Sequence, residues 1–276
     1  MKEWIGYKTK PFVSTYGWKD AALYALSIGA QTDELPFLYE NTRGGMKVFP
    51  SFCVLSMNTL LMDLLAKLDL PRILHGEQLI RLHRPIPPEG RLRTVGEIPN
   101  VYDKGQGKPA LICLRTDTAL EGGEPLFTNE AVIFYRGAGG FGGEPGPKAE
   151  PLDPPRGVEP DFRISYALPE NQAALYRLTG DVNPLHIDPE FAKKGGLDRP
   201  ILHGLCSFGY ATRAILYGAC GGDAARFKEL KVRFSGMVYP GETLTTEGWK
   251  DRDGRYLIQV RTERAVVMSQ AYATVE

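Results

Sequence analysis

The feature that most constrains the fold is an internal duplication. At an offset of 152 residues, the string Ala22-Leu23-Tyr24 falls on Ala174-Leu175-Tyr176, and Ile80-Arg81-Leu82 falls on Val232-Arg233-Phe234. Near the end of the chain the offset shortens to 146, which is the effect that loop deletions between strands would have. A divergent duplication of this kind predicts two units of the same architecture. At the same offset of 152, further matches are Pro88 with Pro240, Leu92 with Leu244, Thr94 with Thr246 and Gly96 with Gly248.

The two units are separated by a segment rich in Gly and Pro. Residues 136–160 show neither helical nor strand periodicity, which is typical of a linker. We therefore divide the chain into an N-terminal unit (1–137), a linker (138–160) and a C-terminal unit (161–276).

Each unit repeats one order of expected elements. A short amphipathic helix comes first, a longer apolar helix follows, and segments rich in Val, Ile, Thr and aromatic residues then predict antiparallel strands. The expected short helices are 18–27 and 169–179, the long helices 52–68 and 204–217, and the strands of the second unit 230–237, 243–249, 255–264 and 265–275. The helix at 204–217 is apolar on nearly every face, so it must be enclosed. A strongly curved antiparallel sheet around one buried helix satisfies this need and gives an α+β fold.

The composition excludes several classes of partner. Lys plus Arg equals Asp plus Glu at 33 each, so the chain has no basic footprint for nucleic acid. No apolar stretch is long enough to span a bilayer, and no secretory leader is evident, so we expect a cytoplasmic protein without a membrane. The four cysteines lack CxxC or metal-ligand spacing and are expected to be buried free thiols: Cys53, Cys113, Cys206 and Cys220.

The stretch 176–188 carries the chemistry. Its sequence is Tyr-Arg-Leu-Thr-Gly-Asp-Val-Asn-Pro-Leu-His-Ile-Asp. Gly180 predicts the end of a helix and Pro184 fixes a tight turn. The side chains of Asp181, Asn183 and His186 should therefore project from one short constrained loop.

Three interpretations of this loop compete. Asp181 and Asn183 could be turn and capping residues, with His186 a surface imidazole. A metal site with Asp188 as a further ligand is a second interpretation, but no other carboxylates or histidines stand at ligand spacing, so we expect no metal. In the third, Asp181 and His186 are a general acid–base pair that shares one water.

The whole pattern resembles the signature of a known family. The run Gly-Asp-Val-Asn-Pro-Leu-His-Ile-Asp at 180–188, followed by Arg-Pro-Ile-Leu-His-Gly at 199–204, resembles the (R)-specific enoyl-CoA hydratases, also called the MaoC-like or hydratase 2 family. The first unit resembles the same family at 20–30, 74–77 and 136–143. The resemblance implies the double hot-dog fold, in which two antiparallel sheets each wrap a long helix.

The resemblance also implies roles by position. Asp181 and His186 match the catalytic dyad, Asn183 the residue that helps to hold the water and the dyad, and Gly204 the glycine whose backbone N–H binds the thioester carbonyl. The implied reaction is the reversible hydration of trans-2-enoyl-CoA to (3R)-3-hydroxyacyl-CoA, as in fatty-acid metabolism such as β-oxidation. The family needs neither a metal nor a redox cofactor, since coenzyme A is part of the substrate, and its two-unit members commonly form homodimers.

The duplication assigns the first unit a different role. At the offset of 152, Gly29, Gln31, Glu34 and Phe52 replace Asp181, Asn183, His186 and Gly204 in turn. We therefore expect the first unit to be catalytically silent, and we expect replacement of Glu34 by alanine to change little. The resemblance implies that this unit, with Phe52, shapes a tunnel for the acyl chain; the alternative is that it merely completes the sheet.

Other candidate residues carry weaker signals. The phosphates of CoA need cations, and Arg233, Lys231, Arg163 and Lys193 are candidates, although a basic residue on a strand is more often solvated. His203 either lines the pocket or is a packed structural histidine, and we expect the second. The string Ile-Leu-His-Gly at 73–76 recurs at 201–204, but at an offset of 128, so we interpret it as coincidence.

Two other functions remain open from the sequence. A hot-dog acyl-CoA thioesterase would direct water to the carbonyl carbon, and a non-catalytic acyl-CoA-binding protein would need no dyad. The presence of Asp181, Asn183, His186 and Gly204 together argues against the second.

Overall fold

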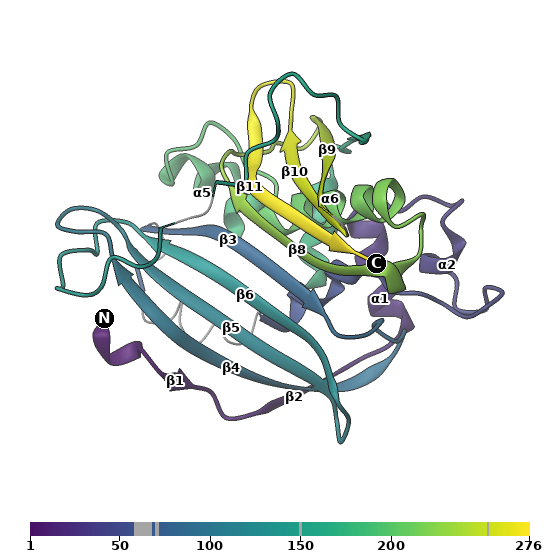
Figure 1. Ribbon diagram of the computed structural model, residues 1–276, viewed down its shortest axis with the longest axis horizontal. Coiled ribbons are helices and arrows are strands. Elements are labelled where there is room, and N and C mark those ends of the chain that lie inside the picture. The colour runs from purple at the N-terminus through teal and green to yellow at the C-terminus, as the bar shows by residue number, and fades with distance from the viewer. Residues whose placement is uncertain (58–67, 70–71, 149–150, 253) are drawn as a thin grey trace.

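One antiparallel sheet runs through both units (Figure 1). The computed structural model describes residues 1–57, 68–69, 72–148, 151–252 and 254–276. Within these residues the strand order is β1-β4-β5-β6-β3-β8-β11-β10-β9-β7, and β2 also pairs with β4. The first unit supplies β1 (Tyr7–Lys8), β2 (Phe12–Tyr16), β3 (Ile73–Leu82), β4 (Gly90–Asp103), β5 (Ala110–Leu120) and β6 (Pro125–Tyr135). The second supplies β7 (Phe162–Ala167), β8 (Phe227–Phe234), β9 (Thr243–Arg252), β10 (Arg255–Arg261) and β11 (Val266–Val275).

The pairing of β3 with β8 agrees with the duplication. The register pairs Glu77 with Arg233, Leu79 with Lys231, and Arg81 with Glu229. The duplication matches Leu79 with Lys231, so this pair joins two equivalent positions. It also matches Glu77 with Glu229 and Arg81 with Arg233, so a local twofold axis relates the pair Glu77–Arg233 to the pair Glu229–Arg81. The side-chain ion pairs Arg81–Glu229 and Arg233–Glu77, each 2.5 Å long, are related by the same axis. The two units therefore meet as a symmetric dimer would, within one chain.

The long helix of the second unit is enclosed, as predicted. This helix, α6 (Gly204–Ala219), is buried at every residue from Cys206 to Leu216 and packs against β7, β8 and β9. In Figure 1 it lies behind the strands of the second unit. The shorter helices are α1 (Trp18–Ser27), α2 (Leu35–Leu38), α4 (Gln172–Tyr176) and α5 (Pro189–Lys194), with 3-10 turns at Lys2–Trp4, Arg177–Thr179, Pro184–His186 and Ala224–Arg226.

The predicted long helix of the first unit is wrong over its described part. Residues 58–67 of the expected 52–68 helix lie outside the described residues, and Pro50–Met57 forms a 3-10 helix instead of an α-helix. The carbonyl oxygen of Cys53 accepts hydrogen bonds from Ser56 Oγ at 2.9 Å and from Asn129 Nδ2 at 3.0 Å. These side-chain bonds compete with the backbone bond that an α-helix would require.

The segment between the two units is attached to the sheet. No helix or strand lies within its described part, 136–148 and 151–161. The Asp103 carboxylate nevertheless accepts hydrogen bonds from the backbone N–H groups of Gly140 and Gly142, each at 2.7 Å. Further along, Leu152 is 5% exposed and donates its N–H to Gln270 Oε1.

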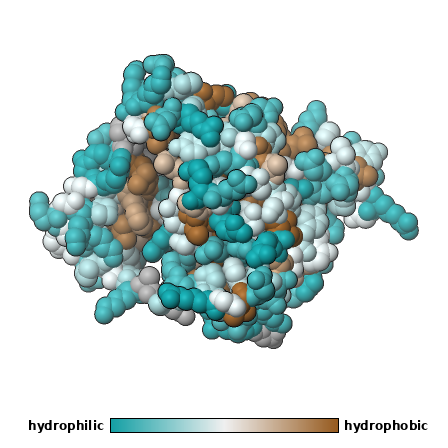
Figure 2. All heavy atoms as spheres, turned by 90° about the horizontal axis from the view of Figure 1, so that it is seen from above, coloured by the Kyte–Doolittle hydropathy of each residue, from teal (hydrophilic) through white to brown (hydrophobic). Residues whose placement is uncertain are grey.

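The molecular surface is mainly hydrophilic in the view of Figure 2, with hydrophobic side chains exposed in separate areas. Among the described residues, no helix combines the length and the hydropathy needed to cross a membrane. The main hydrophobic core is shared by the two units: it includes Tyr24 and Phe52 from the first and Phe208 and Leu230 from the second.

Candidate active site

The loop that follows α4 is held by its own polar side chains. Gly180 has φ +128°, which favours glycine, and it ends the short 3-10 turn after α4. The Asp181 Oδ1 atom accepts the N–H of Asn183 at 3.1 Å, and Asn183 Oδ1 accepts the N–H of Leu185 at 3.0 Å. Asp188 then caps α5 through the N–H of Glu190. The turn and capping roles considered from the sequence are therefore present, and they fix the loop that carries Asp181 and His186.

Three side chains gather at this loop. A carboxylate oxygen of Asp181 and one ring nitrogen each of His186 and His203 all lie within 4.8 Å of one another. The rings of His186 and His203 stack with centroids 3.8 Å apart at 31°. His203 is 1% exposed, and its Nε2 donates to the backbone oxygen of Asp181 at 3.2 Å. Separations of this size suit a water molecule held between two of the groups.

The hydrogen bond of His186 defines its tautomer. Its Nδ1 lies 2.9 Å from the carbonyl oxygen of Ile201. A carbonyl oxygen can only accept, so Nδ1 carries the proton and Nε2 of the neutral ring keeps its lone pair. Burial lowers the pKa of His186 below its ordinary value, against the opposing effects of the Ile201 bond and the Asp181 charge. The ring is therefore a neutral base near pH 7.

The start of α6 offers free backbone donors. The N–H groups of Cys206 and Ser207 bond to the carbonyl oxygen of His203, whereas those of Gly204 and Leu205 have no partner within the described chain. Unpaired N–H groups and the positive end of the helix dipole favour a partly negative oxygen here. A Cβ at position 204 would lie 3.4 Å from Cε1 of Phe234, an ordinary contact. The fold alone would thus tolerate a side chain at Gly204, which is exposed.

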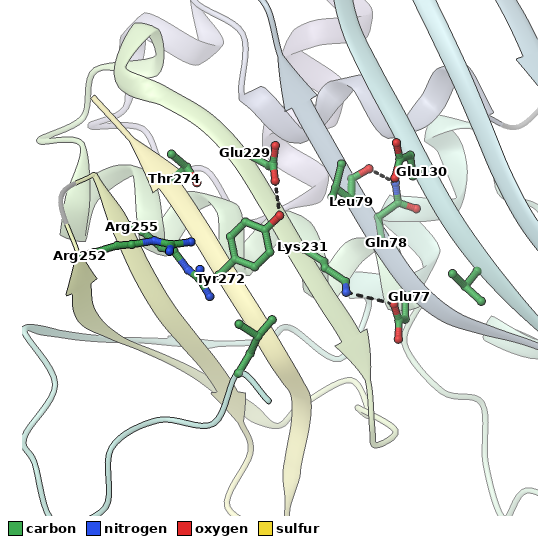
Figure 3. Close-up of a pocket in the computed structure, with 12 residues that line it drawn as sticks. Glu77, Gln78, Leu79, Glu130, Glu229, Lys231, Arg252, Arg255, Tyr272 and Thr274 are labelled. Atoms are coloured by element: carbon green, nitrogen blue, oxygen red, sulfur yellow. Dashed lines mark hydrogen bonds and ion pairs between the residues drawn. The ribbon is translucent and has the colours of Figure 1, made fainter. Parts of the chain in front are cut away.

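The predicted CoA-binding cations of β8 do not lie beside the dyad. The buried residues Leu230 and Val232 face the core, so Lys231 and Arg233 point to the opposite face of the sheet. Both contact the Glu77 carboxylate, Lys231 at 3.5 Å and Arg233 at 2.5 Å, and Figure 3 shows Lys231 directed toward Glu77.

The two other predicted cations also have acidic partners. Arg163 on β7 bonds to Glu247 at 2.6 Å. Lys193 on α5 lies in the element that follows the loop of Asp181 and His186, and it contacts Glu190 at 3.2 Å. Among the four candidate cations, Lys193 is therefore the one nearest in the chain to the dyad.

A pocket of about 640 Å³ lies on this outer face, over the junction of the two units (Figure 3). It is lined by charged side chains of both signs, and Lys231 among them pairs with Glu77. Its lining includes none of Asp181, His186 and Gly204. We therefore place the candidate active site at the loop and the start of α6. The lining residues on β3, β6 and β8 are Glu77, Gln78, Leu79, Glu130, Val132, Glu229 and Lys231.

The counterpart positions in the first unit are occupied by structural contacts. Gly29 replaces Asp181, and a Cβ there would lie 2.5 Å from the ring of Tyr210 on α6. Glu34 replaces His186 and forms a buried ion pair with Arg213, also on α6. Phe52 is 5% exposed and packs against the rings of Tyr16 and Tyr24, so it is a core residue.

This ion pair argues against the expectation that replacement of Glu34 changes little, because the Glu34 side chain is 8% exposed and bonds to the long helix of the second unit. Glu34 Oε1 accepts from Arg213 Nε at 2.9 Å and from the Tyr217 hydroxyl at 2.7 Å. The Arg213 guanidinium also lies over the Tyr166 ring at 4.1 Å.

Fold and site together define a two-unit hot-dog protein in which one carboxylate and two imidazoles gather near the start of a buried helix. Residues 152–271 match the MaoC like domain, and residues 14–137 match the MFE-2 hydratase 2 N-terminal domain. The chain is 41% identical over 286 residues to a probable enoyl-CoA hydratase 2 of Dictyostelium discoideum, covering 100% of this chain and 96% of the relative. It is 42% identical to the peroxisomal enoyl-CoA hydratase 2 of Arabidopsis thaliana, covering 85% and 82%.

Solved structures agree with these matches. A MaoC-like dehydratase from Phytophthora capsici superposes with a TM-score of 0.90 at 33% identity, covering 100% of this chain and 97% of that one. A Mycobacterium tuberculosis protein described as a double hot-dog fold shares the fold alone, with a TM-score of 0.61 at 14% identity over 98% and 95% of the chains. The chain belongs to the MaoC-like dehydratase and enoyl-CoA hydratase 2 family. The family and the fold class expected from the sequence are thereby confirmed, with the two sheets joined into one.

Proposed function

We propose that this protein is a hydro-lyase that reversibly adds water to trans-2-enoyl-CoA thioesters and forms (3R)-3-hydroxyacyl-CoA, with Asp181 and His186 as its acid–base pair. One observation carries the proposal: a neutral imidazole with its Nε2 lone pair free lies within 4.8 Å of a carboxylate. Gly204 is the first residue of α6, and its backbone N–H has no partner among the described residues.

The groups suffice for the reaction. A water between Asp181 and His186 gives up one proton as its oxygen attacks C3 of the enoyl group, and the pair returns one proton to C2. The new C–O and C–H bonds account for both parts of the water, and the thioester remains intact. Negative charge grows on the thioester oxygen during the attack, and the Gly204 N–H is oriented to stabilise it.

Asn183 supports this arrangement through its backbone and its side chain. Its N–H fixes the Asp181 carboxylate, and its Oδ1 caps the turn that carries His186. The carbonyl of Ile201 orients His186, and His203 holds the backbone of Asp181. The segment 199–204, which contains Ile201 and His203, therefore positions the loop at 180–188.

The test is hydration measured by loss of the enoyl-thioester absorbance. The substrates are crotonyl-CoA and a ten-carbon trans-2-enoyl-CoA, and the product is offered to an (S)-specific hydroxyacyl-CoA dehydrogenase. The proposal predicts rapid hydration and a product that this dehydrogenase does not oxidise. Release of free CoA thiol without hydration would instead indicate a thioesterase, and binding without either reaction would indicate an acyl-CoA-binding protein.

The rate should depend on pH through His186. Burial lowers the pKa of His186 below its ordinary value of 6.5, so the ring is still neutral at a pH somewhat below 6.5. In this neutral form it can accept a proton from water. We expect kcat/KM to fall on the acid side with an inflection below 6.5. Binding of a saturated acyl-CoA, followed over the same pH range, controls for ionisation of the CoA phosphate. An inflection above 6.5, or a rate that rises toward acid pH, would contradict this role.

We propose that the reaction needs neither a metal nor a redox cofactor. Asp181, His186 and His203 lie close enough to share an ion, but the proposed steps are proton transfers between water, Asp181 and His186, which require no Lewis acid. We expect exhaustive dialysis against a chelator to leave kcat unchanged. Loss of activity that zinc or another divalent ion restores would show that the cluster binds a metal.

We further propose that the first unit is catalytically silent and shapes the acyl tunnel. In the first unit, the positions that correspond to the candidate site contact Tyr210 and Arg213 or are occupied by the Phe52 ring, which supports the absence of catalysis there. The tunnel, CoA contacts at Lys193, Lys231, Arg163 and Arg233, a homodimer and a cytoplasmic location remain predictions. Some relatives carry names that place them in peroxisomes.

A further inference from the structure

His75 lies at an irregularity in β3. The register between β3 and β6 shifts between His75 and Glu77, which leaves Gly76 as an extra residue. A Cβ on Gly76 would lie 2.4 Å from the Phe134 ring, so the backbone approaches that ring closely. Bulges of this kind redirect a side chain and are common next to active sites.

The redirected ring packs beside the start of α6. His75 meets the ring of Phe234 edge to face, with centroids 5.1 Å apart at 70°. The same Phe234 ring lies against the position of Gly204, 3.4 Å from a Cβ built there. His75 is thus one aromatic ring away from the free N–H of Gly204, although it belongs to the first unit.

One ring nitrogen of His75 has no hydrogen-bond partner. Its Nε2 is buried and makes no hydrogen bond within the described residues. Burial lowers the pKa of His75 to about 4, although hydrogen bonding of the ring to Gln78 and to the backbone of Glu77, and the charge of Asp181, all favour the protonated form. The ring is therefore neutral near pH 7. A buried polar atom without a partner destabilises the folded protein unless a ligand or a water satisfies it.

We propose that His75 is a substrate-binding residue of the active site, whose Nε2–H donates a hydrogen bond to a carbonyl oxygen of the bound acyl-CoA. This inference rests on the proposed function. It means that the silent unit contributes a polar group to the reaction centre, so the site is shared by both units.

The chemistry of the substrate limits the possible partners. A hydrocarbon acyl chain has no atom that accepts a hydrogen bond, so a polar group here must face the thioester end. Two carbonyl oxygens lie there: that of the thioester and that of the nearest amide in the pantetheine arm. Contact with Phe234, beside Gly204, places His75 on that side of the site. Both oxygens require a donor, and hence a ring protonated at Nε2.

The experiment compares His75→Phe, which keeps a ring of similar size, with His75→Gln, which keeps a side-chain N–H donor. The matched control is His83→Phe, since His83 follows the same strand, is exposed and bonds to Thr128 Oγ1. We expect kcat/KM to fall about tenfold in His75→Phe, to recover in large part in His75→Gln and to stay unchanged in the control. Thermal melting checks that all three variants are folded.

The kinetic constants separate the two oxygens. Loss in kcat indicates the thioester oxygen, because its charge grows in the transition state. A raised KM, with weaker calorimetric binding of a saturated acyl-CoA, indicates the pantetheine amide. Wild-type kcat, KM and binding in His75→Phe would overturn the inference, as would equal losses in the Phe and Gln variants. If the wild type hydrates no enoyl-CoA, the proposed function fails, and binding of the saturated acyl-CoA still tests His75.

Discussion

Replacing Asp181 with asparagine should lower the hydration rate by about 100- to 10,000-fold and leave the fold intact. Asparagine keeps an oxygen at Oδ1, which can still accept the N–H of Asn183, so the loop retains its geometry. The variant loses the charge and the basicity that the reaction needs. His186→Ala should cause a loss of the same order, because it removes the imidazole that lies beside Asp181 and whose Nε2 keeps its lone pair.

Initial rates with both enoyl-CoA substrates measure this effect, and circular dichroism checks the fold. The control is Asp188→Asn in the same loop. Its Oδ1 can still cap α5 through the N–H of Glu190, and the change alters one exposed charge. We expect Asp188→Asn to keep nearly the wild-type rate. A folded Asp181→Asn variant with more than a tenth of the wild-type rate would remove Asp181 from the acid–base pair.

Glu34→Ala should destabilise the protein by about 3–5 kcal/mol, the range found when one partner of a buried ion pair is removed. The Arg213 side chain is 7% exposed, and without Glu34 its charge would remain buried and uncompensated. Tyr217 would lose its hydroxyl partner as well. Because α6 carries Arg213 near its middle and Gly204 at its start, we expect the loss in the free energy of unfolding to be accompanied by a smaller loss of activity.

Urea denaturation measures the free energy of unfolding of this variant. Removing both charges in Glu34→Leu with Arg213→Met should be less harmful than Glu34→Ala alone, because no buried charge is left unpaired. Glu124→Ala is the exposed control: its carboxylate pairs with Arg84 at the surface, and its loss should cost less than about 1 kcal/mol. A Glu34→Ala variant as stable as this control would refute the structural role.

The fold followed from features that are local in the sequence or repeated along it. Segments rich in Val, Ile, Thr and aromatic residues located the strands β8 to β11 of the second unit, and the apolar faces of 204–217 predicted an enclosed helix, found as α6. The offset of 152 predicted that the units are equivalent, and the pairing of Leu79 with Lys231 agrees with it. Each of these signals is a spacing of residues along the chain, which can be recognised without knowledge of tertiary contacts.

Contacts between distant residues could not be obtained in this way. Glu34 and Arg213 are 179 positions apart, and no periodicity indicates that they meet. The Cys53 carbonyl is bonded by Asn129 from another strand, so the 3-10 helix at Pro50–Met57 depends on tertiary contacts.

The candidate site likewise contains some residues that the sequence predicted and others that it did not. Asp181, Asn183 and His186 lie in one loop and were found through their spacing, together with the resemblance to a family. His203 proved to be packed, as the sequence favoured, but it also stacks on His186. His75 was missed: its Ile-Leu-His-Gly string had a visible copy at 201–204, yet the offset of 128 does not fit the duplication. The predicted cations of β8 instead face Glu77, because the strand alternation places them on the outer face.

The most direct test of the central claim is mass spectrometry of the product formed from trans-2-decenoyl-CoA in oxygen-18 water. Wild type and Asp181→Asn are incubated with the thioester, and the intact CoA ester and the free acid are both quantified. The proposed function predicts that the wild type forms an intact 3-hydroxyacyl-CoA that carries one labelled oxygen on C3, and that Asp181→Asn forms almost none. Labelled oxygen in a released carboxylic acid, or equal product from both proteins, would contradict hydration by Asp181 and His186.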